Sequence, residues 1–436
     1  MYWILRFRLW LRLAAIGATG LLVYASIVPL RYTPLSWAET MRRWQEVPWL
    51  ELGVYHRADW VANALVVIPS GFFATGAVWF SSHRRWVHWG GAALIALQLC
   101  GLVYAIEFVQ LWFPPRTVSQ NDLFAGCVGA VIGPLAWFAA GPLTARMLVG
   151  FLTIPTIRGR LRVLSLFGVG AAVLYSVLPL DLVVNGQELA RKWESGRIVL
   201  VPSPSDLGDL VVLQGAVLAA IRMLPVGLWF GLDRRPWGSS VPAMVTVAVM
   251  MELVQVPIYS KYASTTEVAW GILGGFIGWW LGQGPRPLVR LVARPWPWAV
   301  AMAAFLVAAP VALLGRYEGV ITDAERLGQR WDDFWTPPLL RYYYSSEYDA
   351  VSNLAGKLGM FACFGVAVAG WSWSVRMAER WWPFLAGLGV VILWGAAIEI
   401  AQVYLKPLIA DATDVAIYAL GFGLGHAASR LTLREP

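Results

Sequence analysis

Residues 93–113 read ALIALQLCGLVYAIEFVQLWF, a stretch apolar enough to cross a membrane as a helix. One side chain within it, Glu107, is nevertheless a carboxylic acid. A carboxylate at mid-membrane costs about 2.5–3.5 kcal/mol on insertion scales, and less near a helix end. Such a residue usually has a partner or a function, so Glu107 is expected to have one or the other.

The composition is typical of a multi-pass membrane protein. Of the 436 residues, 58% are hydrophobic, only 14% are charged and 26 are Trp, which leaves no large polar domain. We therefore predict an all-α integral membrane protein. Twelve segments have about the length and character of membrane-spanning helices: 9–30, 59–80, 89–112, 122–140, 161–180, 209–231, 241–259, 267–282, 296–315, 350–373, 382–404 and 411–428.

Arginine is concentrated in alternate connections between these segments, beginning with Arg6, Arg8 and Arg12 and ending with Arg430 and Arg434. Such connections lie on the cytoplasmic side of a membrane, so both termini are expected inside. These loop ends account for the net charge of +8 without a nucleic-acid partner. The first apolar segment is expected to be retained rather than cleaved, because its end, YASIVPL, returns as YSVLPL at 175–180.

The surroundings of Glu107 occur three times in the chain. In each copy a Gln follows the Glu three residues later: Glu107 and Gln110, Glu252 and Gln255, Glu399 and Gln402. Another acid follows each Glu by fifteen residues: Asp122, Glu267 and Asp414. Two glycines come next, at the spacing of close helix packing in membranes: Gly129 and Gly133, Gly274 and Gly278, Gly421 and Gly425.

The predicted span before each Glu also begins with polar residues. The first copy has Asp59 and Asn63, the third has Asp349 and Asn353, and the second has Asp209 without a matching Asn. Repetition at this period indicates one structural unit used several times. The predicted units are 1–145, 146–290, which is degenerate, and 291–436.

Each unit is expected to contain one span, an amphipathic helix in the outer interface, and three further spans. Trp among mixed charges indicates the interfacial helices, which are expected within 37–53, 186–198 and 323–335. An even number of spans per unit makes the units parallel, about an axis along the membrane normal. The prediction is thus about twelve transmembrane helices in three parallel four-helix units.

Within a unit, the polar groups of three helices are expected to meet at the outer end of the bundle. Two structural interpretations compete with a binding role. The acids fifteen residues after each Glu fit capping boxes, as in Ser119-x-x-Asp122, and each Glu and Gln pair fits a polar tie between helices. The candidate ligand-binding residues of the first unit are Asp59, Asn63, Glu107, Gln110, Arg116 and Asp122.

Two cations favour the first unit as the functional one. Arg222 and Lys357 lie in the second spans of units two and three, where they are expected to neutralise Glu252 and Glu399. The first unit has Val66 thereabouts, so Glu107 is left to Asn63, Gln110 and Arg116.

The first unit resembles the VanZ-like family of small bacterial membrane proteins. The resemblance rests on Asp-x3-Asn-x5-Pro-x-Gly from Asp59, Glu-x2-Gln, Pro-x-Arg ending at Arg116, then Ser119, Asp122 and a glycine-rich span. It covers about residues 20–140 well and the other two units in part, since they lack Pro-x-Arg. It implies a protein of the bacterial cytoplasmic membrane and a connection with antibiotic resistance, because the founding member is associated with resistance to teicoplanin.

Three functions remain open. The first is non-enzymatic binding, at the outer leaflet, of a lipid headgroup, a lipid-linked precursor or an amphipathic antimicrobial. The second is a transporter. The third is an enzyme acting on a lipid-linked substrate, with Glu107 and Asp122 as acid and base. No nucleophile is evident and the four His are not clustered at ligand spacing, so neither a metal nor a cofactor is expected. The expected partner is a membrane lipid or lipid-linked ligand.

Overall fold

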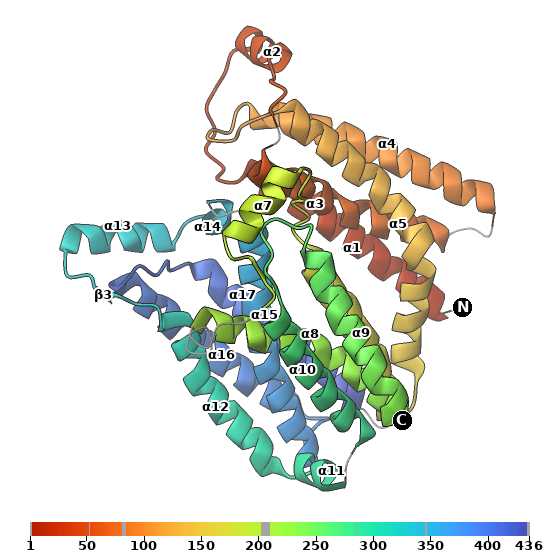
Figure 1. Ribbon diagram of the computed structural model, residues 1–436. Coiled ribbons are helices and arrows are strands. Elements are labelled where there is room, and N and C mark those ends of the chain that lie inside the picture. Colours follow the sequence, from red (N-terminus) through yellow and green to blue (C-terminus); the bar gives the residue numbers. More distant parts are fainter. Residues whose placement is uncertain are drawn as a thin grey trace.

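The computed structural model describes residues 2–51, 53–80, 84–201, 210–284, 286–344 and 347–433. This part of the chain is almost entirely helical, with seventeen helices and four strands of two residues each (Figure 1). Ten of the described helices are long and apolar enough to cross a membrane. The prediction of an all-α, multi-pass membrane protein is therefore confirmed.

The first third of the chain forms α1 (Tyr2–Ile27), α2 (Trp37–Gln45), α3 (Val54–Trp79), α4 (Arg85–Gln110) and α5 (Gln120–Thr153). The second forms α6 (Ile157–Val177), α7 (Gly186–Glu194), β1 (Ile198–Val199), α8 (Leu210–Leu232), α9 (Trp237–Gln255), β2 (Ala263–Ser264), α10 (Thr265–Gln283) and α11 (Arg286–Val292). The last forms α12 (Pro295–Leu314), β3 (Gly319–Val320), α13 (Ala324–Phe334), α14 (Leu340–Tyr343), α15 (Glu347–Ser374), α16 (Trp382–Tyr404), β4 (Leu405–Lys406) and α17 (Ala412–Leu433).

The ten membrane-spanning candidates agree with ten of the twelve predicted spans. The other two predicted spans, 267–282 and 411–428, form α10 and α17, which are helical but fall outside that set of ten. Both begin with polar residues, and α17 also carries Asp414, His426 and Arg430, which lower its apolar character. Helix α5 runs thirteen residues beyond the predicted end at 140, so the predicted unit boundary at 145/146 lies inside it, and the boundary at 290/291 lies inside α11.

The repeated glycines lie where two helices cross in each third of the chain. Helix α3 packs against α5, α8 against α10, and α15 against α17. A methyl group added to a glycine at these crossings would clash with a backbone oxygen of the facing helix: at Gly129 it would lie 2.1 Å from Ala64, at Gly274 2.0 Å from Ala220, and at Gly421 2.5 Å from Leu358. The expected packing role of the glycines is confirmed, because only a residue without a Cβ permits this approach.

These contacts also show which residues of the three thirds are structurally equivalent. Ala64, Ala220 and Leu358 occupy equivalent positions, because each faces the equivalent glycine of its own third. Each third also has its own hydrophobic core. Val103 and Ala130 belong to the first core; Met223 and Met244 belong to the second; Phe361, Tyr418 and Phe422 belong to the third.

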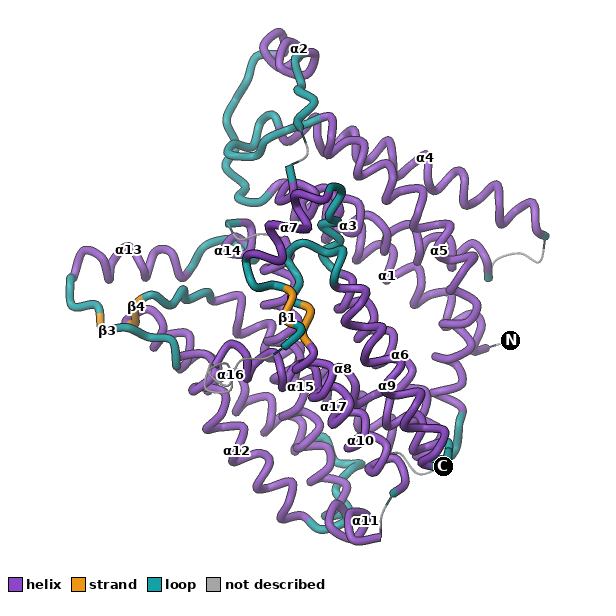
Figure 2. The backbone as a smooth tube through the Cα atoms, in the orientation of Figure 1, coloured by secondary structure: helices purple, strands orange, loops and turns teal. Residues whose placement is uncertain are grey.

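The three short amphipathic helices, α2, α7 and α13, form where the sequence predicts them. In Figure 1 α2 lies at the top, α13 at the left and α7 between them, whereas α11 lies at the bottom. Two strand pairs join loops, one near the centre of Figure 2 and one at its left: β1 is parallel to β2, and β3 is antiparallel to β4.

Cations on α7 and α13 hold these two helices to the ends of long helices. Lys192 donates through Nζ to the carbonyl oxygens of Gln255 (2.7 Å) and Val256 (2.9 Å), at the end of α9. Arg330 donates through Nε to Val403 (2.6 Å), at the end of α16. The last carbonyls of a helix have no partner within it, so a cation there satisfies them.

Candidate functional site

The site lies between the end of α4 and the beginning of α5. Ser119 caps α5, and its Oγ accepts a hydrogen bond from the backbone N–H of Asp122 (3.2 Å). The predicted capping role of Ser119 is thus confirmed. Asp122 itself lies in the first turn, where the helix dipole favours a negative charge. Its carboxylate accepts hydrogen bonds from the hydroxyl of Ser119 (2.6 Å) and from Nδ2 of Asn63 in α3 (2.6 Å), so capping accounts for only part of its role.

Glu107 lies one turn before the end of α4 and is only 9% exposed. Its Oε2 is buried and has no hydrogen-bond partner among the described residues. Leaving a buried acceptor unsatisfied costs about 1–3 kcal/mol, and more when the group is charged. The described residues therefore leave part of the cost of burying Glu107 uncompensated.

A cavity of about 400 Å³ adjoins Glu107. All six candidate residues of the first third line it: Asp59, Asn63, Glu107, Gln110, Arg116 and Asp122. The sequence thus identified side chains from three helices and one loop that meet around a single space. Acidic residues predominate among the ionisable groups of the lining, which are Glu51, Asp59, Glu107, Asp122, Arg116 and His56.

The hydrogen bonds of the candidates differ from the prediction that Asn63, Gln110 and Arg116 satisfy Glu107. Asn63 donates through Nδ2 to Asp122 Oδ1 (2.6 Å). Gln110 donates through Nε2 to the carbonyl oxygen of Ser26 (2.9 Å), which ties α4 to α1. Arg116 donates through Nε to the carbonyl oxygen of Val28 (2.7 Å). None of these three hydrogen bonds reaches Glu107.

Several residues of the cavity were not predicted from the sequence. Asn121 is buried and holds the backbone of Leu50 through two hydrogen bonds, 2.7 Å to its N–H and 3.1 Å to its carbonyl oxygen. Tyr343, from α14 in the last third, lies under the guanidinium of Arg116, which is 4.1 Å from the ring centre. No periodic pattern could have indicated Tyr343, because its contact with Arg116 joins residues far apart in the chain.

In the second third, the equivalent carboxylates are satisfied by a cation. Arg222 donates through Nη2 to Glu252 Oε1 (2.9 Å) and to Glu267 Oε2 (2.8 Å). Glu252 also accepts hydrogen bonds from Gln255 Nε2 (2.9 Å) and from the backbone N–H of Ser264 (3.2 Å). The prediction that Arg222 neutralises Glu252 is confirmed. Asp209, the remaining predicted site residue of this third, lies outside the described residues.

In the last third, a different set of groups satisfies the carboxylates. Glu399 is fully buried and accepts hydrogen bonds from the hydroxyl of Tyr418 and from the backbone N–H of Asp411 (3.0 Å). Lys357 donates to Asp414 instead of Glu399, which corrects the prediction for this cation.

Tyr342 and Gln402 complete the polar contacts of the last third. Tyr342 donates to Asp414 Oδ1 (2.7 Å), and burial raises the pKa of its hydroxyl, so this donor stays protonated. Gln402 donates through Nε2 to the carbonyl oxygen of Leu313 (3.4 Å) in α12. Gln402 thus ties α16 to α12 as Gln110 ties α4 to α1.

The predicted equivalence of Asp349 and Asn353 with Asp59 and Asn63 is shifted by one helical turn. Because Leu358 occupies the position of Ala64, Lys357 is the structural counterpart of Asn63. Lys357 and Asn63 indeed make the same contact, with the acid in the first turn of the helix that crosses their own, Asp414 in α17 and Asp122 in α5. Asp349 and Asn353 are exposed. The Asp-x3-Asn pattern predicted the wrong equivalence, because in the last third it lies one helical turn further from the repeated glycine contact than it does in the first.

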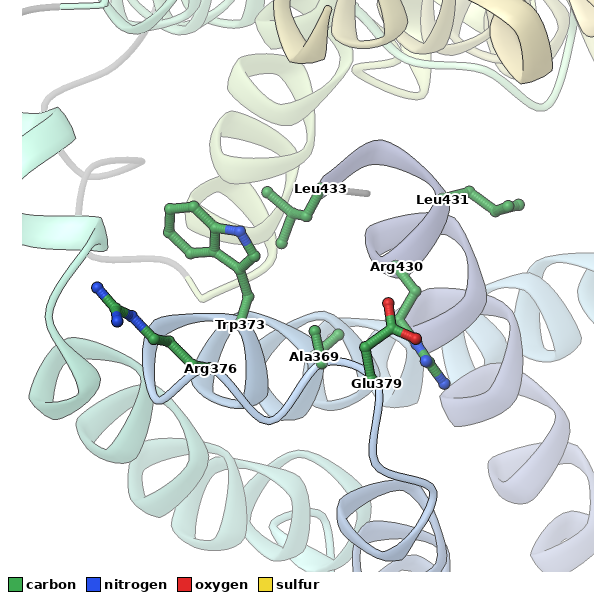
Figure 3. A pocket seen from close by; sticks show the side chains of 8 residues that line it. Ala369, Trp373, Arg376, Glu379, Arg430, Leu431 and Leu433 are labelled. Carbon is green, nitrogen blue, oxygen red and sulfur yellow. The ribbon is translucent and has the colours of Figure 1, made fainter. Parts of the chain in front are cut away.

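A second large cavity, of about 540 Å³, lies between α15, the segment after it, and α17 (Figure 3). Its lining includes Trp373, Arg376, Glu379 and Arg430. None of the repeated Glu and Gln pairs lines it. Among the described residues, no group of three or more His, Cys, Asp or Glu could hold a metal ion.

Ten apolar helices, of which α3, α4 and α5 line a polar cavity, are those of a multi-pass membrane protein. Residues 10–141 match the family described as VanZ/LLP1, so this part of the chain is a VanZ-like domain. The matched region contains all six candidate residues of the first third. No curated protein and no solved structure matches the chain.

Proposed function

We propose that this protein resides in the bacterial cytoplasmic membrane and binds a lipid headgroup, a lipid-linked precursor or an amphipathic antimicrobial at the outer leaflet, in the cavity of its first third. The observation that carries the proposal is Glu107, which is nine-tenths buried, lines the cavity and has an oxygen with no hydrogen-bond partner among the described residues. A ligand that donates a hydrogen bond to this carboxylate would remove the cost of leaving it unsatisfied.

The proposal includes a topology of about twelve transmembrane helices in three parallel four-helix units, with both termini in the cytoplasm. The equivalent crossings of α3 with α5, α8 with α10 and α15 with α17 support the three units. The arginine-rich connections support the orientation. With this orientation the cavity beside the end of α4 faces the outer leaflet, within reach of headgroups.

The experiment compares purified wild type with Glu107→Gln and Glu399→Gln after extraction from a bacterial membrane. Native mass spectrometry of each protein identifies the lipids that stay bound. We expect wild type to retain a specific lipid that Glu107→Gln loses. Glu399→Gln is the matched control, because this carboxylate occupies the equivalent position but does not line the cavity, and it is expected to keep the lipid.

Retention of the same lipid by both variants, at the level of wild type, would contradict the proposal. The experiment also separates binding from the two alternatives. A transporter would instead produce solute flux in proteoliposomes that depends on Glu107. An enzyme would convert a lipid-linked substrate, with loss of product in Glu107→Gln and Asp122→Asn.

A further inference from the structure

In the second and last thirds of the chain, a cationic side chain binds the repeated carboxylates. In the second third, one guanidinium nitrogen of Arg222 bridges Glu252 and Glu267, the counterparts of Glu107 and Asp122. In the last third, the ammonium of Lys357 pairs with Asp414, the counterpart of Asp122. Both examples place a cation on a buried or half-buried carboxylate at the same level of the bundle.

The first third has no side chain of this kind at the equivalent positions. The register set by Ala64 and Ala220 makes Val66 the counterpart of Arg222. The counterpart of Lys357 is Asn63, a neutral amide that already donates to Asp122. Glu107 therefore has no cation on the facing helix α3, whereas its counterpart Glu252 has Arg222 on α8. The positive side chain in its cavity is Arg116, from the loop after α4.

The hydroxyl that satisfies Glu399 is also missing from the first third. Tyr418 precedes Gly421 by three residues, and Gly421 is the counterpart of Gly129, so Gly126 stands where the last third has this tyrosine. Val66 and Gly126 both line a small cavity of about 30 Å³ beside Glu107. This space is of the size of one water molecule. A larger group must therefore approach Glu107 from the cavity of about 400 Å³.

The charges around the larger cavity favour a cation. Its lining includes four acidic residues, Glu51, Asp59, Glu107 and Asp122, against Arg116 and His56. A positive group in this space would be attracted by those acids that are ionised, and its presence would favour their ionised form. It would also supply the hydrogen-bond donor that Glu107 Oε2 lacks.

We infer that the ligand of this pocket carries a primary ammonium group, which binds between Glu107 and Asp122 as Arg222 binds between Glu252 and Glu267. This inference rests on the proposed function and names the chemistry of its ligand. The ammonium belongs either to a lipid headgroup of the ethanolamine type or to a soluble amine. In either case the ligand supplies a cation to the first third, where the second third has the side chain of Arg222.

The test uses a panel of probes on the full-length protein in detergent micelles. The lipids are phosphatidylethanolamine, its trimethylated counterpart phosphatidylcholine, and phosphatidylglycerol; the soluble amine is glycerophosphoethanolamine. Native mass spectrometry measures retention and thermal shift measures stabilisation. Wild type is expected to bind phosphatidylethanolamine about tenfold or more tightly than the other two lipids, since only this headgroup can donate hydrogen bonds from a cation.

The decisive variant is Val66→Arg, which introduces the cation of the second third into the first. We expect it to fold, to melt higher than wild type and to lose phosphatidylethanolamine, because the new guanidinium occupies the position of the ammonium. Asn63→Lys, built on the contact of Lys357 with Asp414, tests the same inference should Val66→Arg fail to fold. Glu107→Gln is expected to lose the preference for the amine.

The outcomes separate the inference from the proposed function. If wild type retains all three lipids equally and Glu107→Gln loses all of them, the inference of an ammonium group is wrong but the proposed headgroup binding stands. No retained lipid in wild type and no shift with the soluble amine would overturn both. Stabilisation by glycerophosphoethanolamine that Val66→Arg abolishes would support the ammonium from a soluble source. A response to phosphatidylethanolamine alone would support it from the membrane.

Discussion

At the scale of single residues, one buried carboxylate has three different environments in this chain. Glu252 is held by the guanidinium of Arg222, Glu399 by the hydroxyl of Tyr418 and a backbone N–H, and Glu107 has one oxygen with no partner among the described residues. Hydrogen bonds to a buried carboxylate offset the solvation that it loses on folding, whereas a carboxylate oxygen left unsatisfied keeps that cost. The same residue type is thus structural at two positions and a candidate for ligand binding at the third.

The first prediction concerns Arg222. Arg222→Met is expected to lower the free energy of unfolding by about 3–5 kcal/mol, because it leaves the buried Glu252 and the largely buried Glu267 without their cation. Denaturant titration in detergent micelles, followed by Trp fluorescence, measures the change. Adding Glu252→Gln and Glu267→Gln to Arg222→Met should recover part of the loss. A single variant as stable as wild type would show that this ion pair contributes nothing to folding.

At the scale of secondary-structure elements, the glycine crossings bring two helices close enough to share a site. Because α3 and α5 approach at Gly129, Asn63 can reach Asp122 directly. The equivalent crossing of α15 with α17 brings Lys357 to Asp414. The glycines therefore position the polar groups as well as allowing the backbones to pack.

The second prediction compares two glycines of α17. Gly425→Ala is expected to lower the free energy of unfolding by about 1–3 kcal/mol or more, since its Cβ would lie 2.0 Å from the carbonyl oxygen of Ala362. Gly423→Ala is the matched control on the same helix, because nothing lies within 4 Å of the added atom. It should be neutral or stabilise by up to about 1 kcal/mol. Equal melting temperatures for the two variants would rule out the close crossing.

At the scale of the whole molecule, polar contacts join the thirds to one another. Arg57 of α3 donates to both carboxylate oxygens of Glu188 in α7, at 3.0 and 3.1 Å. Arg160 of α6 donates to the carbonyl oxygen of Leu431 in α17 (2.9 Å). The thirds therefore pack together, and the cavity of the first third is completed by Tyr343 from the last third.

The third prediction concerns the contact between the first two thirds. The Arg57 guanidinium holds the pKa of Glu188 below its ordinary value. The stabilisation is therefore fully present above the ordinary pKa of a glutamate, about 4.3, and is lost as the pH falls through the lower pKa of the folded state. We expect Arg57→Met to melt below wild type at neutral pH and the difference to shrink under acidic conditions. A difference that stays constant from pH 7 down to pH 3 would contradict this.

Much of the site could be predicted because its residues repeat at fixed spacings. Repetition picked out Glu107, Gln110 and Asp122, and Asp59 and Asn63 came from the weaker match that precedes them. The cavity brings all of them together. The partners of these residues could not be predicted in the same way. Lys357 was assigned to Glu399 by analogy with Arg222, because sequence spacing does not reveal that Lys357 lies three residues before the counterpart of Arg222 and so at the level of Asn63. Tyr343 escaped prediction because its role depends on a contact between the first and last thirds.

The sequence by itself determined the helices and the polar residues at their ends, because hydrophobic length and local spacing are properties of a single segment. It also determined that the glycines lie at helix contacts, since small residues at a spacing of four share one helix face. Only the tertiary structure decided which of the three repeated glutamates has an oxygen without a partner among the described residues. That depends on whether Arg222, Tyr418 or Val66 projects from the facing helix at the right level, and such a level is fixed by packing in three dimensions.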